Sequence, residues 1–417
     1  MDAIDILLTR GVDTIYPTRD ALEKVLRSGK KLKLYQGFDP TGTQLHVGHA
    51  VGFRKLRQWQ DLGHKVIFLV GDGTGLAGDP SGKMKARGRF MSREELRENA
   101  KAYLMQASKI VRFDGENPVE ILYNGDWLTK LTLEDILNIA QNFTVQQMIE
   151  RDMYQVRMKA GDPINLREFL YPLLQGYDSV AMEVDLELGG SDQTFNMLAG
   201  RTLVKNMLGK EKFVMTTPLL ADSKGVKIGK TEGNVIGLTD EPIDFYRKIM
   251  ELGDDTIIPC FTLLTDTPLE EIEIIKKSME KNVDSPMTFK LNLAFKLTQS
   301  LFSEAEAAIA ESDYKIRYQN NDLQNAILET VKFEDNDNYM DMSVKAGFAK
   351  SNSDARRLII SGATGIAGPV ELMKTVTTNA TAIGKTLKYV VTNPKEIPPK
   401  HEGLIFTVGK KAVKIGK

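Results

Sequence analysis

Hydrophobic residues follow two different periods along the first 71 positions of the chain. The segment KLKLYQGF, residues 31–38, alternates apolar and polar positions and predicts a strand. Residues 47–62 repeat apolar side chains at helical spacing, and Gly63 is a suitable end for that helix. The segment KVIFLVG, residues 65–71, is a continuous apolar run, typical of a strand buried on both faces. Strand, helix and strand with short connections predict a βαβ unit and a parallel sheet.

Helical periodicity dominates the rest of the chain, with short strands between the helices. We expect helix over most of 88–160 with a strand inside 113–128, a helix over 165–179, a strand and turn over 180–190, and helices over 191–208 and 241–318. The polar, weakly patterned stretch 320–341 is the best linker candidate. Ligands of parallel sheets bind beyond the carboxyl ends of the strands, so candidate chemistry is expected at 37–49 and 71–83.

Length and composition indicate a globular protein of two or three domains. The chain has 417 residues, 42% of them hydrophobic and 27% charged, and no apolar run near the ~18 residues that span a bilayer. Its amino terminus, MDAIDILLTRG, lacks the features of a secretory signal. The single cysteine, Cys260, excludes an internal disulfide and a cysteine-based zinc cluster. We expect a cytoplasmic protein with no membrane segment and no protein-bound metal.

Charge is unevenly distributed, although the whole chain carries a net charge of only −1. Residues 341–417 hold 13 Lys and Arg against 5 Asp and Glu, a net charge of +8, which leaves −9 for the remainder. Such asymmetry indicates a small basic domain on an acidic body, and a solvated basic tail explains the charge equally well.

Two of the four histidines, His46 and His49, lie three residues apart in GFDPTGTQLHVGH, residues 37–49. Zinc-binding pairs on helices usually have a spacing of four and a nearby carboxylate, so this pair does not match a metal motif. Two core histidines are the plain alternative. However, the pair lies at the expected start of a helix, where backbone N–H groups and the helix dipole bind anions. Gly48 leaves room for a flat ring near the backbone, and the combination suits a nucleotide triphosphate.

Two further glycine-punctuated loops could bind the same phosphates. GDGTGLAGDPSGK, residues 71–83, lacks the Walker register but could direct a carboxylate into the cleft and hold a lysine over phosphate. KGVKIGKTEGN, residues 224–234, could close over a pyrophosphate as negative charge develops on it. Each loop alone is equally well explained as a solvated surface loop. The candidate residues in and just after these loops are Asp79, Lys83, Arg87, Lys227, Lys230 and Thr231.

Together these features resemble the class I aminoacyl-tRNA synthetases, which carry a His-x-Gly-His segment after the first strand and a later Lys-x-x-Lys-Ser/Thr loop. Longer segments are similar to the bacterial-type tyrosyl-tRNA synthetase family, namely YQGFDPT (35–41), GDPSGK (78–83), YPLLQGYDS (171–179) and GGSDQ (189–193). SVKAGFAKSNSDARRLIISGATGIAG, residues 343–368, resembles the S-four-like RNA-binding domain that ends those enzymes. The resemblance therefore covers essentially the whole chain.

The resemblance implies an α/β fold with three domains. A Rossmann-like parallel-sheet catalytic domain would cover 1–235, with a helical insertion at about 85–160 that forms a dimer interface. A helical anticodon-arm domain would cover 236–325, and a small α+β S-four-like RNA-binding domain would cover 341–417. The implied partners are tRNA(Tyr), L-tyrosine, ATP with Mg²⁺ on its phosphates, and a second copy of the chain. The expected RNA contacts are Lys350, Arg356 and Arg357.

The implied activity is that of a tyrosine–tRNA ligase. ATP activates tyrosine to tyrosyl-adenylate with release of pyrophosphate, and the tyrosyl group then passes to the 3′ end of the tRNA. Positioning and charge stabilisation carry such a reaction. The positions that match the family's catalytic residues are Thr41, His46, His49, Lys83, Arg87, Lys227, Lys230 and Thr231. Those that match its ATP site are Gly37, Asp39, His46, Gly48, His49, Asp192 and Lys230.

Tyr171, Gln175 and Asp178 fall at i, i+4 and i+7, so they share one face of the expected helix. A polar face in an apolar setting suits a polar ligand, and a solvated helix face is the alternative. The resemblance implies that Tyr171, Gln175 and Asp79 hold the α-amino group of tyrosine. It also implies that Tyr35 and Asp178 bond the phenolic hydroxyl and that Gln193 helps to place the carboxylate.

Three alternatives remain beside this interpretation. Tryptophanyl-tRNA synthetase shares the fold and both signatures, although Tyr35 with Asp178 and the basic carboxy-terminal region argue against it. A nucleotidylyltransferase shares the His-x-Gly-His turn but lacks the lysine-rich loop. A non-catalytic, synthetase-derived RNA-binding protein would not need a complete nucleotide site. The loop at 227–231 reads KIGKT where class I enzymes have KMSKS, which keeps both lysines and leaves its hydroxyl contacts open.

Overall fold

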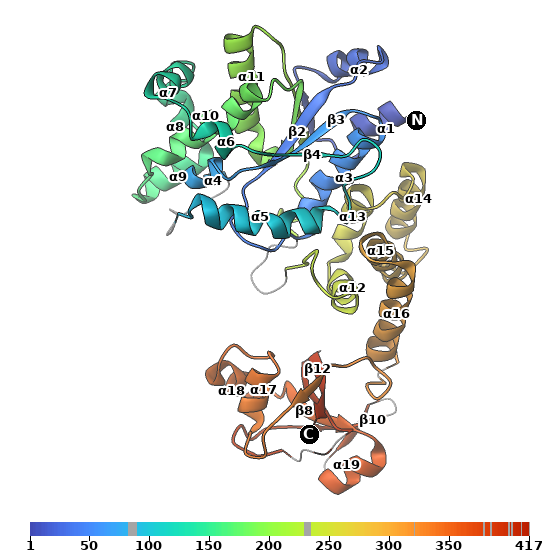
Figure 1. Ribbon diagram of the computed structural model, residues 1–417. Coiled ribbons are helices and arrows are strands. Elements are labelled where there is room, and N and C mark those ends of the chain that lie inside the picture. The colour runs from blue at the N-terminus through green and yellow to red at the C-terminus, as the bar shows by residue number, and fades with distance from the viewer. Residues whose placement is uncertain are drawn as a thin grey trace. The chain divides into compact units, whose positions relative to one another are not determined.

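The computed structural model of the protein consists of two compact units, Met1–Glu304 and Ala305–Lys417 (Figure 1). The residues that it describes are 1–81, 90–228, 235–320, 322–377, 380–383, 386–398, 401, 403–409 and 411–416. Within these ranges, no helix is both long and apolar enough to cross a membrane.

The first unit is built on a six-stranded sheet with the order β1-β6-β5-β2-β3-β4. Its strands are β1 Thr14–Tyr16, β2 Lys33–Phe38, β3 Lys65–Val70, β4 Glu120–Tyr123, β5 Leu186–Gly190 and β6 Phe213–Thr217. Strands β2 to β6 are parallel, and β1 pairs with β6 in the antiparallel sense. The predicted α/β class with a parallel sheet is therefore confirmed.

Helices cover both faces of this sheet, with α3 on one side of the strands and the pair α10–α11 on the other (Figure 1). The helices of this unit are α1 Ala3–Thr9, α2 Arg19–Arg27, α3 Val47–Asp61, α4 Thr74–Ala77, α5 Arg93–Ala107, α6 Gly125–Leu128, α7 Leu133–Ala140, α8 Val145–Ile149, α9 Asp152–Ala160, α10 Leu166–Ala181, α11 Thr194–Leu208, α12 Pro242–Met250, α13 Ile257–Leu264, α14 Leu269–Glu280 and α15 Pro286–Leu301, with short 3-10 helices at Ser191–Gln193 and Asp254–Thr256.

Helix α3 shows how the sequence produces this packing. Its apolar positions Phe53, Leu56 and Trp59 are fully buried, as their helical spacing predicts. Burial of each such side chain contributes roughly 1.5–3 kcal/mol relative to an exposed position. The helix therefore lies firmly against the sheet, and its first turn is held at the carboxyl end of β2.

Strand order reverses between β2 and β5, because the chain winds outward from β2 through β3 to β4 and, on the other side, from β5 to β6. At such a point the loops that leave the two neighbouring strands diverge, and a crevice opens beyond their carboxyl ends. The segments that follow β2 and β5 are residues 39–46 and 191–193. This is where the sequence predicts the chemistry of the first loop.

The second unit is built on a separate six-stranded sheet with the order β7-β12-β11-β8-β10-β9. Its elements are α16 Glu304–Tyr314, a π-helical turn at Lys315–Gln319, β7 Thr330–Lys332, α17 Tyr339–Lys345, α18 Asn352–Ile360, β8 Thr364–Gly368, α19 Val370–Val376, β9 Thr381–Ile383, β10 Thr386–Val390, β11 Ile405–Val408 and β12 Lys411–Gly416. Pairs are antiparallel except for β12 with β7. Its core gathers around Tyr339, Ile366 and Phe406.

The stretch 320–341, expected to be a linker, supplies an edge strand to this second sheet. Strand β7 pairs with β12 in parallel, and Ala326 and Leu328 pack against Ile405. Three residues with polar ends, TVK, are too few to show a strand period in the sequence. Tertiary pairing, not local pattern, makes this segment a strand.

Candidate active site

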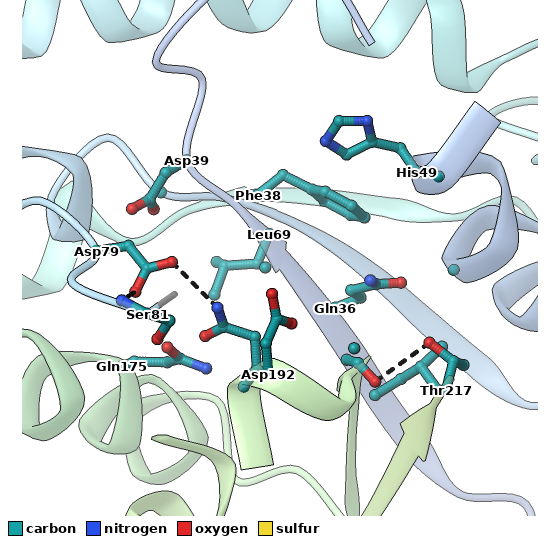
Figure 2. A pocket seen from close by; sticks show the side chains of 18 of the residues that line it. Gln36, Phe38, Asp39, His49, Leu69, Asp79, Ser81, Gln175, Asp192 and Thr217 are labelled. Atoms are coloured by element: carbon teal, nitrogen blue, oxygen red, sulfur yellow. Dashed lines mark hydrogen bonds between the residues drawn. The ribbon is translucent and has the colours of Figure 1, made fainter. Parts of the chain in front are cut away.

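A cavity of about 540 Å³ opens at the carboxyl edge of the first sheet and gathers most of the predicted residues (Figure 2). The predicted residues that line it are Tyr35, Gly37, Asp39, Thr41, His46, Gly48, His49, Asp79, Tyr171, Gln175, Asp178, Asp192, Gln193 and Lys227. The predicted residues Lys83, Arg87, Lys230 and Thr231 lie outside the described part of the chain.

The histidine pair forms the amino terminus of α3. His46 is the residue before the helix, and its Nδ1 accepts a hydrogen bond from Gly48 N at 3.2 Å. His49 Nδ1 accepts from His46 N, also at 3.2 Å, so each ring caps a backbone N–H of the first turn. Because both Nδ1 atoms are acceptors, each neutral imidazole carries its proton on Nε2. The pair thus combines the positive end of a helix with two Nε2 donors, a suitable setting for an anion.

Gly48 is required by the His46 ring itself. A Cβ at position 48 would lie 2.9 Å from His46 Cε1 and 3.0 Å from its Nδ1, closer than side-chain atoms approach one another. The two imidazole rings lie 4.1 Å apart between centroids, tilted by 49°. The flat ring for which Gly48 leaves room is therefore, in the first instance, that of His46.

Asp178 lies in the cavity wall on α10, with only 1% of its surface exposed. Its Oδ2 accepts from Asn124 Nδ2 at 2.9 Å and its Oδ1 from Trp127 Nε1 at 2.8 Å. Burial raises the pKa of this carboxyl well above its usual range, and the two hydrogen bonds oppose that rise by favouring the ionised form. The carboxylate is thus held in place with lone pairs left for a further donor.

Tyr35 on β2 reaches the same part of the cavity and is 1% exposed. Its hydroxyl lies 3.0 Å from Ser179 Oγ. Burial raises the pKa of the Tyr35 phenol, and the nearby carboxylates of Glu187 and Asp178 raise it further, so the group stays protonated. A protonated phenol and a buried carboxylate close together suit a ligand hydroxyl that can accept from one and donate to the other.

A second polar group surrounds Tyr171 of α10. Burial raises the pKa of its phenol, and the carboxylates of Asp39 and Asp79 raise it further. Asp79 accepts hydrogen bonds from Ser81 N at 2.8 Å and Gln193 Nε2 at 3.0 Å, which Figure 2 shows as dashed lines. Asp39 accepts from Thr74 Oγ1 at 2.7 Å. Two carboxylates facing one cavity create a negative region that suits an ammonium group.

Lys227 enters the cavity from the third predicted loop. Its Nζ lies 3.0 Å from Asp192 Oδ2, and both side chains are partly exposed. Loop 221–228 is tied to itself by the bridge between Ala221 and Lys227. A partly solvated ion pair of this kind contributes little to stability.

Sequence reasoning missed several residues that shape this cavity. Asn124 and Trp127 follow β4, and their position at the carboxyl end of a parallel strand was the available signal. The others are Thr74 and Glu187 in the cavity lining, together with Ser179 and Lys212, which contact Glu187. No pattern in the sequence links Glu187 to Lys212, because the pair meets only through the pairing of β5 with β6.

The predicted RNA contacts lie in the second unit. Lys350, Arg356 and Arg357 are exposed on α18 and the turn before it. Arg357 donates to Asp354 at 2.9 Å. For the described ranges as a whole, no group of three or more His, Cys, Asp or Glu side chains is arranged to hold a metal ion.

Comparison with known proteins identifies the class. The family model for the class I tRNA synthetases (W and Y) matches residues 27–319, and the chain belongs to this family. Similar curated proteins are the tyrosine–tRNA ligases of Dehalococcoides mccartyi (41% identical, covering 86% of this chain and 90% of that protein), Mannheimia succiniciproducens (41%; 90% and 94%) and Thermotoga maritima (39%; 87% and 89%). The resemblance to bacterial-type tyrosyl-tRNA synthetases seen in the sequence is confirmed.

Solved structures agree on the fold. A truncated mitochondrial tyrosyl-tRNA synthetase from Aspergillus nidulans superposes with a TM-score of 0.63 at 25% identity, covering 76% of this chain and 94% of that one. The L-tyrosine complex of the Archaeoglobus fulgidus tyrosyl-tRNA synthetase has a TM-score of 0.59 at 20% identity, covering 75% of this chain and all of the other.

Proposed function

We propose that this protein is a tyrosine–tRNA ligase that activates L-tyrosine with ATP and transfers the tyrosyl group to tRNA(Tyr). The observation that carries the choice of amino acid is the pairing of Tyr35 with Asp178 in one buried part of the cavity. Tryptophan has an indole N–H and no hydroxyl, so it could donate to Asp178 but could not accept from Tyr35. A synthetase for tryptophan would not need both groups.

In the first step a carboxylate oxygen of tyrosine attacks the α-phosphorus of ATP. The bond between that phosphorus and the oxygen leading to the β-phosphate breaks, and pyrophosphate leaves with the electron pair. No side chain forms a bond, so the protein acts by orientation and by stabilising charge. The ammonium group of tyrosine is assigned to the negative region around Tyr171, Asp79 and Gln175, with Gln193 beside its carboxylate.

The phosphates of ATP are assigned to the amino terminus of α3. His46 and His49, at the positive end of the α3 dipole, line the same cavity as Thr41. The ribose is assigned to Asp192, and the turn at Gly37 and Asp39 lies beside it. Lys227 is the described lysine that can follow the leaving pyrophosphate, and Lys83, Arg87, Lys230 and Thr231 are proposed for the same role. ATP enters with Mg²⁺ on its phosphates, which neutralises part of their charge.

In the second step a ribose hydroxyl at the tRNA 3′ end attacks the carbonyl carbon of tyrosyl-adenylate, and AMP leaves. The second unit is proposed to bind the tRNA backbone through Lys350, Arg356 and Arg357. Their exposure and the +8 charge of residues 341–417 support this assignment. ATP and tRNA occur together in the cytoplasm, which we propose as the compartment.

A homodimer is also proposed, on the evidence of exposed apolar side chains carried by α7 to α10. Leu133, Leu166 and Val145 have 75%, 74% and 71% of their surface exposed, and several such side chains on neighbouring helices suit a protein–protein interface. Other exposed apolar side chains of these helices are Leu137, Val156, Met158 and Leu170, and Ile121 on β4 is exposed as well. Sedimentation velocity tests the assignment: the protein should sediment as a dimer, and Leu133→Lys with Val145→Lys should give a folded monomer.

The activity is tested by amino-acid-dependent exchange of pyrophosphate into ATP. Tyrosine should support exchange, and phenylalanine, which lacks the hydroxyl, should support it weakly. A charging assay with tRNA(Tyr) then tests the second step. Exchange without charging would favour a role other than ligation.

A further inference from the structure

A buried ion pair lies directly beneath the cavity. Lys212, just before β6, is fully buried, and Glu187 on β5 is 2% exposed. Lys212 Nζ contacts Glu187 Oε2 and also donates to Ser179 Oγ at 2.6 Å and to Met197 O at 3.3 Å. All three ammonium donors therefore have acceptors. Removing two charges from water is costly, so such a pair needs this complete set of partners.

The space for this ion pair comes from Gly200 on α11. A Cβ at this position would lie 2.5 Å from Lys212 Nζ and 2.9 Å from Ser179 Oγ. The missing side chain thus leaves the volume that the ammonium group occupies. Inside a helix, alanine is favoured over glycine by about 1 kcal/mol, so helix propensity does not explain a glycine here. The space that the ammonium group needs does explain it.

Glu187 fixes the orientation of one predicted tyrosine contact. Its second oxygen, Oε1, accepts a hydrogen bond from Gln175 Nε2 at 3.0 Å. An ionised carboxylate only accepts, so the amide of Gln175 must turn its NH₂ toward Glu187 and its oxygen away. Gln175 Oε1 is buried and makes no hydrogen bond to any described residue. A buried carbonyl oxygen in the wall of a cavity suits a donor from the ligand, such as an ammonium group.

Lys212 sets the direction of a second contact through Ser179. An ammonium group has no lone pair, so Ser179 Oγ accepts from Lys212 and its own proton is left for another partner. Two acceptors lie within reach of this proton: Glu187 Oε2, to which Ser179 Oγ donates at 3.3 Å, and the closer Tyr35 Oη at 3.0 Å. When Ser179 donates to Tyr35, the proton of Tyr35 is available to the cavity. Within the described part of the chain, the competing acceptors for this proton are Gln175 O, at the long distance of 3.5 Å, and the Glu187 carboxylate, whose hydrogen bond helps to raise the pKa of Tyr35. A ligand hydroxyl would take the proton in place of these acceptors.

We propose that the Lys212–Glu187 ion pair is a positioning device for the amino acid, which makes Gln175 an acceptor for its ammonium group and Tyr35 a donor to its hydroxyl. Hydrogen-bond donation then runs from Lys212 to Ser179, from Ser179 to Tyr35 and from Tyr35 to the ligand. The hydroxyl proton of the ligand is left for Asp178. Lys212, Glu187 and Ser179 are positioning residues, because they act through Gln175 and Tyr35. This inference rests on the proposed activation of tyrosine.

The first arm of the proposal is the orientation of Gln175. It is tested with Glu187→Gln combined with Lys212→Met, which leaves no unpaired buried charge. The new amide can donate as well as accept, so Gln175 is no longer restricted to one orientation and can turn its NH₂ toward the ligand. We expect KM for tyrosine in pyrophosphate exchange to rise about ten-fold or more, with KM for ATP within about two-fold of wild type. Tyramine, which has the ammonium group, should inhibit correspondingly less well. The deaminated analogue 3-(4-hydroxyphenyl)propionate keeps only the hydroxyl contact, so it should lose less affinity than tyramine.

Equal weakening of both inhibitors would overturn the first arm, since it would indicate general damage to the cavity. The second arm of the proposal is donation from Ser179 to Tyr35. It is tested with Ser179→Ala, which changes no charge and tests the positioning role even if the double variant does not fold. It should lower the preference for tyrosine over phenylalanine, measured as the ratio of kcat/KM values, by about two- to ten-fold. An unchanged ratio would refute the relay.

The matched control is an exposed ion pair on the same part of the fold, Lys210 with Glu183, whose side chains are 59% and 61% exposed. Lys210→Met with Glu183→Gln should leave every one of these readouts unchanged. Wild-type protein separates the two hypotheses. If it exchanges with tryptophan and not with tyrosine, the proposed function fails; if it uses tyrosine and the variants behave as wild type, only the positioning role fails.

Discussion

Replacing Asp178 by asparagine removes a charge and almost no volume, so it isolates the role of this carboxylate. Both oxygens of Asp178 accept buried hydrogen bonds, from Asn124 and from Trp127. An asparagine has one acceptor oxygen, so one of these two donors must lose its partner, at a cost of about 1–3 kcal/mol. The hydrogen bond from the ligand hydroxyl to a charged acceptor is also lost, and such bonds contribute about 1.5–3 kcal/mol.

We therefore expect kcat/KM for tyrosine in pyrophosphate exchange to fall roughly 10- to 150-fold. KM for ATP should stay within about two-fold, because the phosphates are assigned to His46 and His49 at the start of α3, on a different helix from Asp178. Phenylalanine should lose much less, since it has no hydroxyl to donate. Asp266→Asn is the control, because this carboxylate is 89% exposed and lies outside the cavity. A parallel loss for tyrosine and phenylalanine, or an equal rise in KM for ATP, would refute the assignment.

Three further predictions concern other parts of the molecule. His46→Asn keeps a good helix cap and removes the imidazole, so stability should change by less than about 1 kcal/mol while kcat for exchange falls roughly 10²- to 10³-fold; an unchanged kcat would exclude a phosphate role. Burial and then Lys31 lower the pKa of His64 to about 4, so the unfolded chain binds more protons between pH 6.5 and 4 and stability should fall as pH falls through that window. Urea midpoints should show this slope, and His64→Asn should flatten it. Alanine at the three predicted RNA contacts, Lys350, Arg356 and Arg357, should weaken tRNA binding while pyrophosphate exchange stays normal. The slope of log binding constant against log salt concentration should become shallower by about 0.7–0.9 for each lost phosphate contact.

The central part of the fold could be predicted because its signals are local. The continuous apolar run of β3 and the helical spacing of α3 identify a βαβ unit, and parallel strands place ligands at one known edge. The same periodicity put Tyr171, Gln175 and Asp178 on one face of α10. These three residues do line one cavity in the structure.

Other features depend on contacts that no local pattern carries. Strands β1 and β7 have three residues each, too short for a period to be visible. Because Glu187 and Lys212 are charged, the sequence predicts that both face solvent. They are buried only because the pairing of β5 with β6 and the gap at Gly200 bring them together. Asn124 and Trp127 could have been found from their place after β4, since every parallel strand of this sheet ends at the cavity edge.

The central claim is that this cavity recognises tyrosine. Pyrophosphate exchange with purified protein, measured separately with tyrosine, tryptophan and phenylalanine at equal concentration, tests it most directly. The account predicts rapid exchange with tyrosine, weak exchange with phenylalanine and none above background with tryptophan. Exchange with tryptophan and not with tyrosine would contradict it.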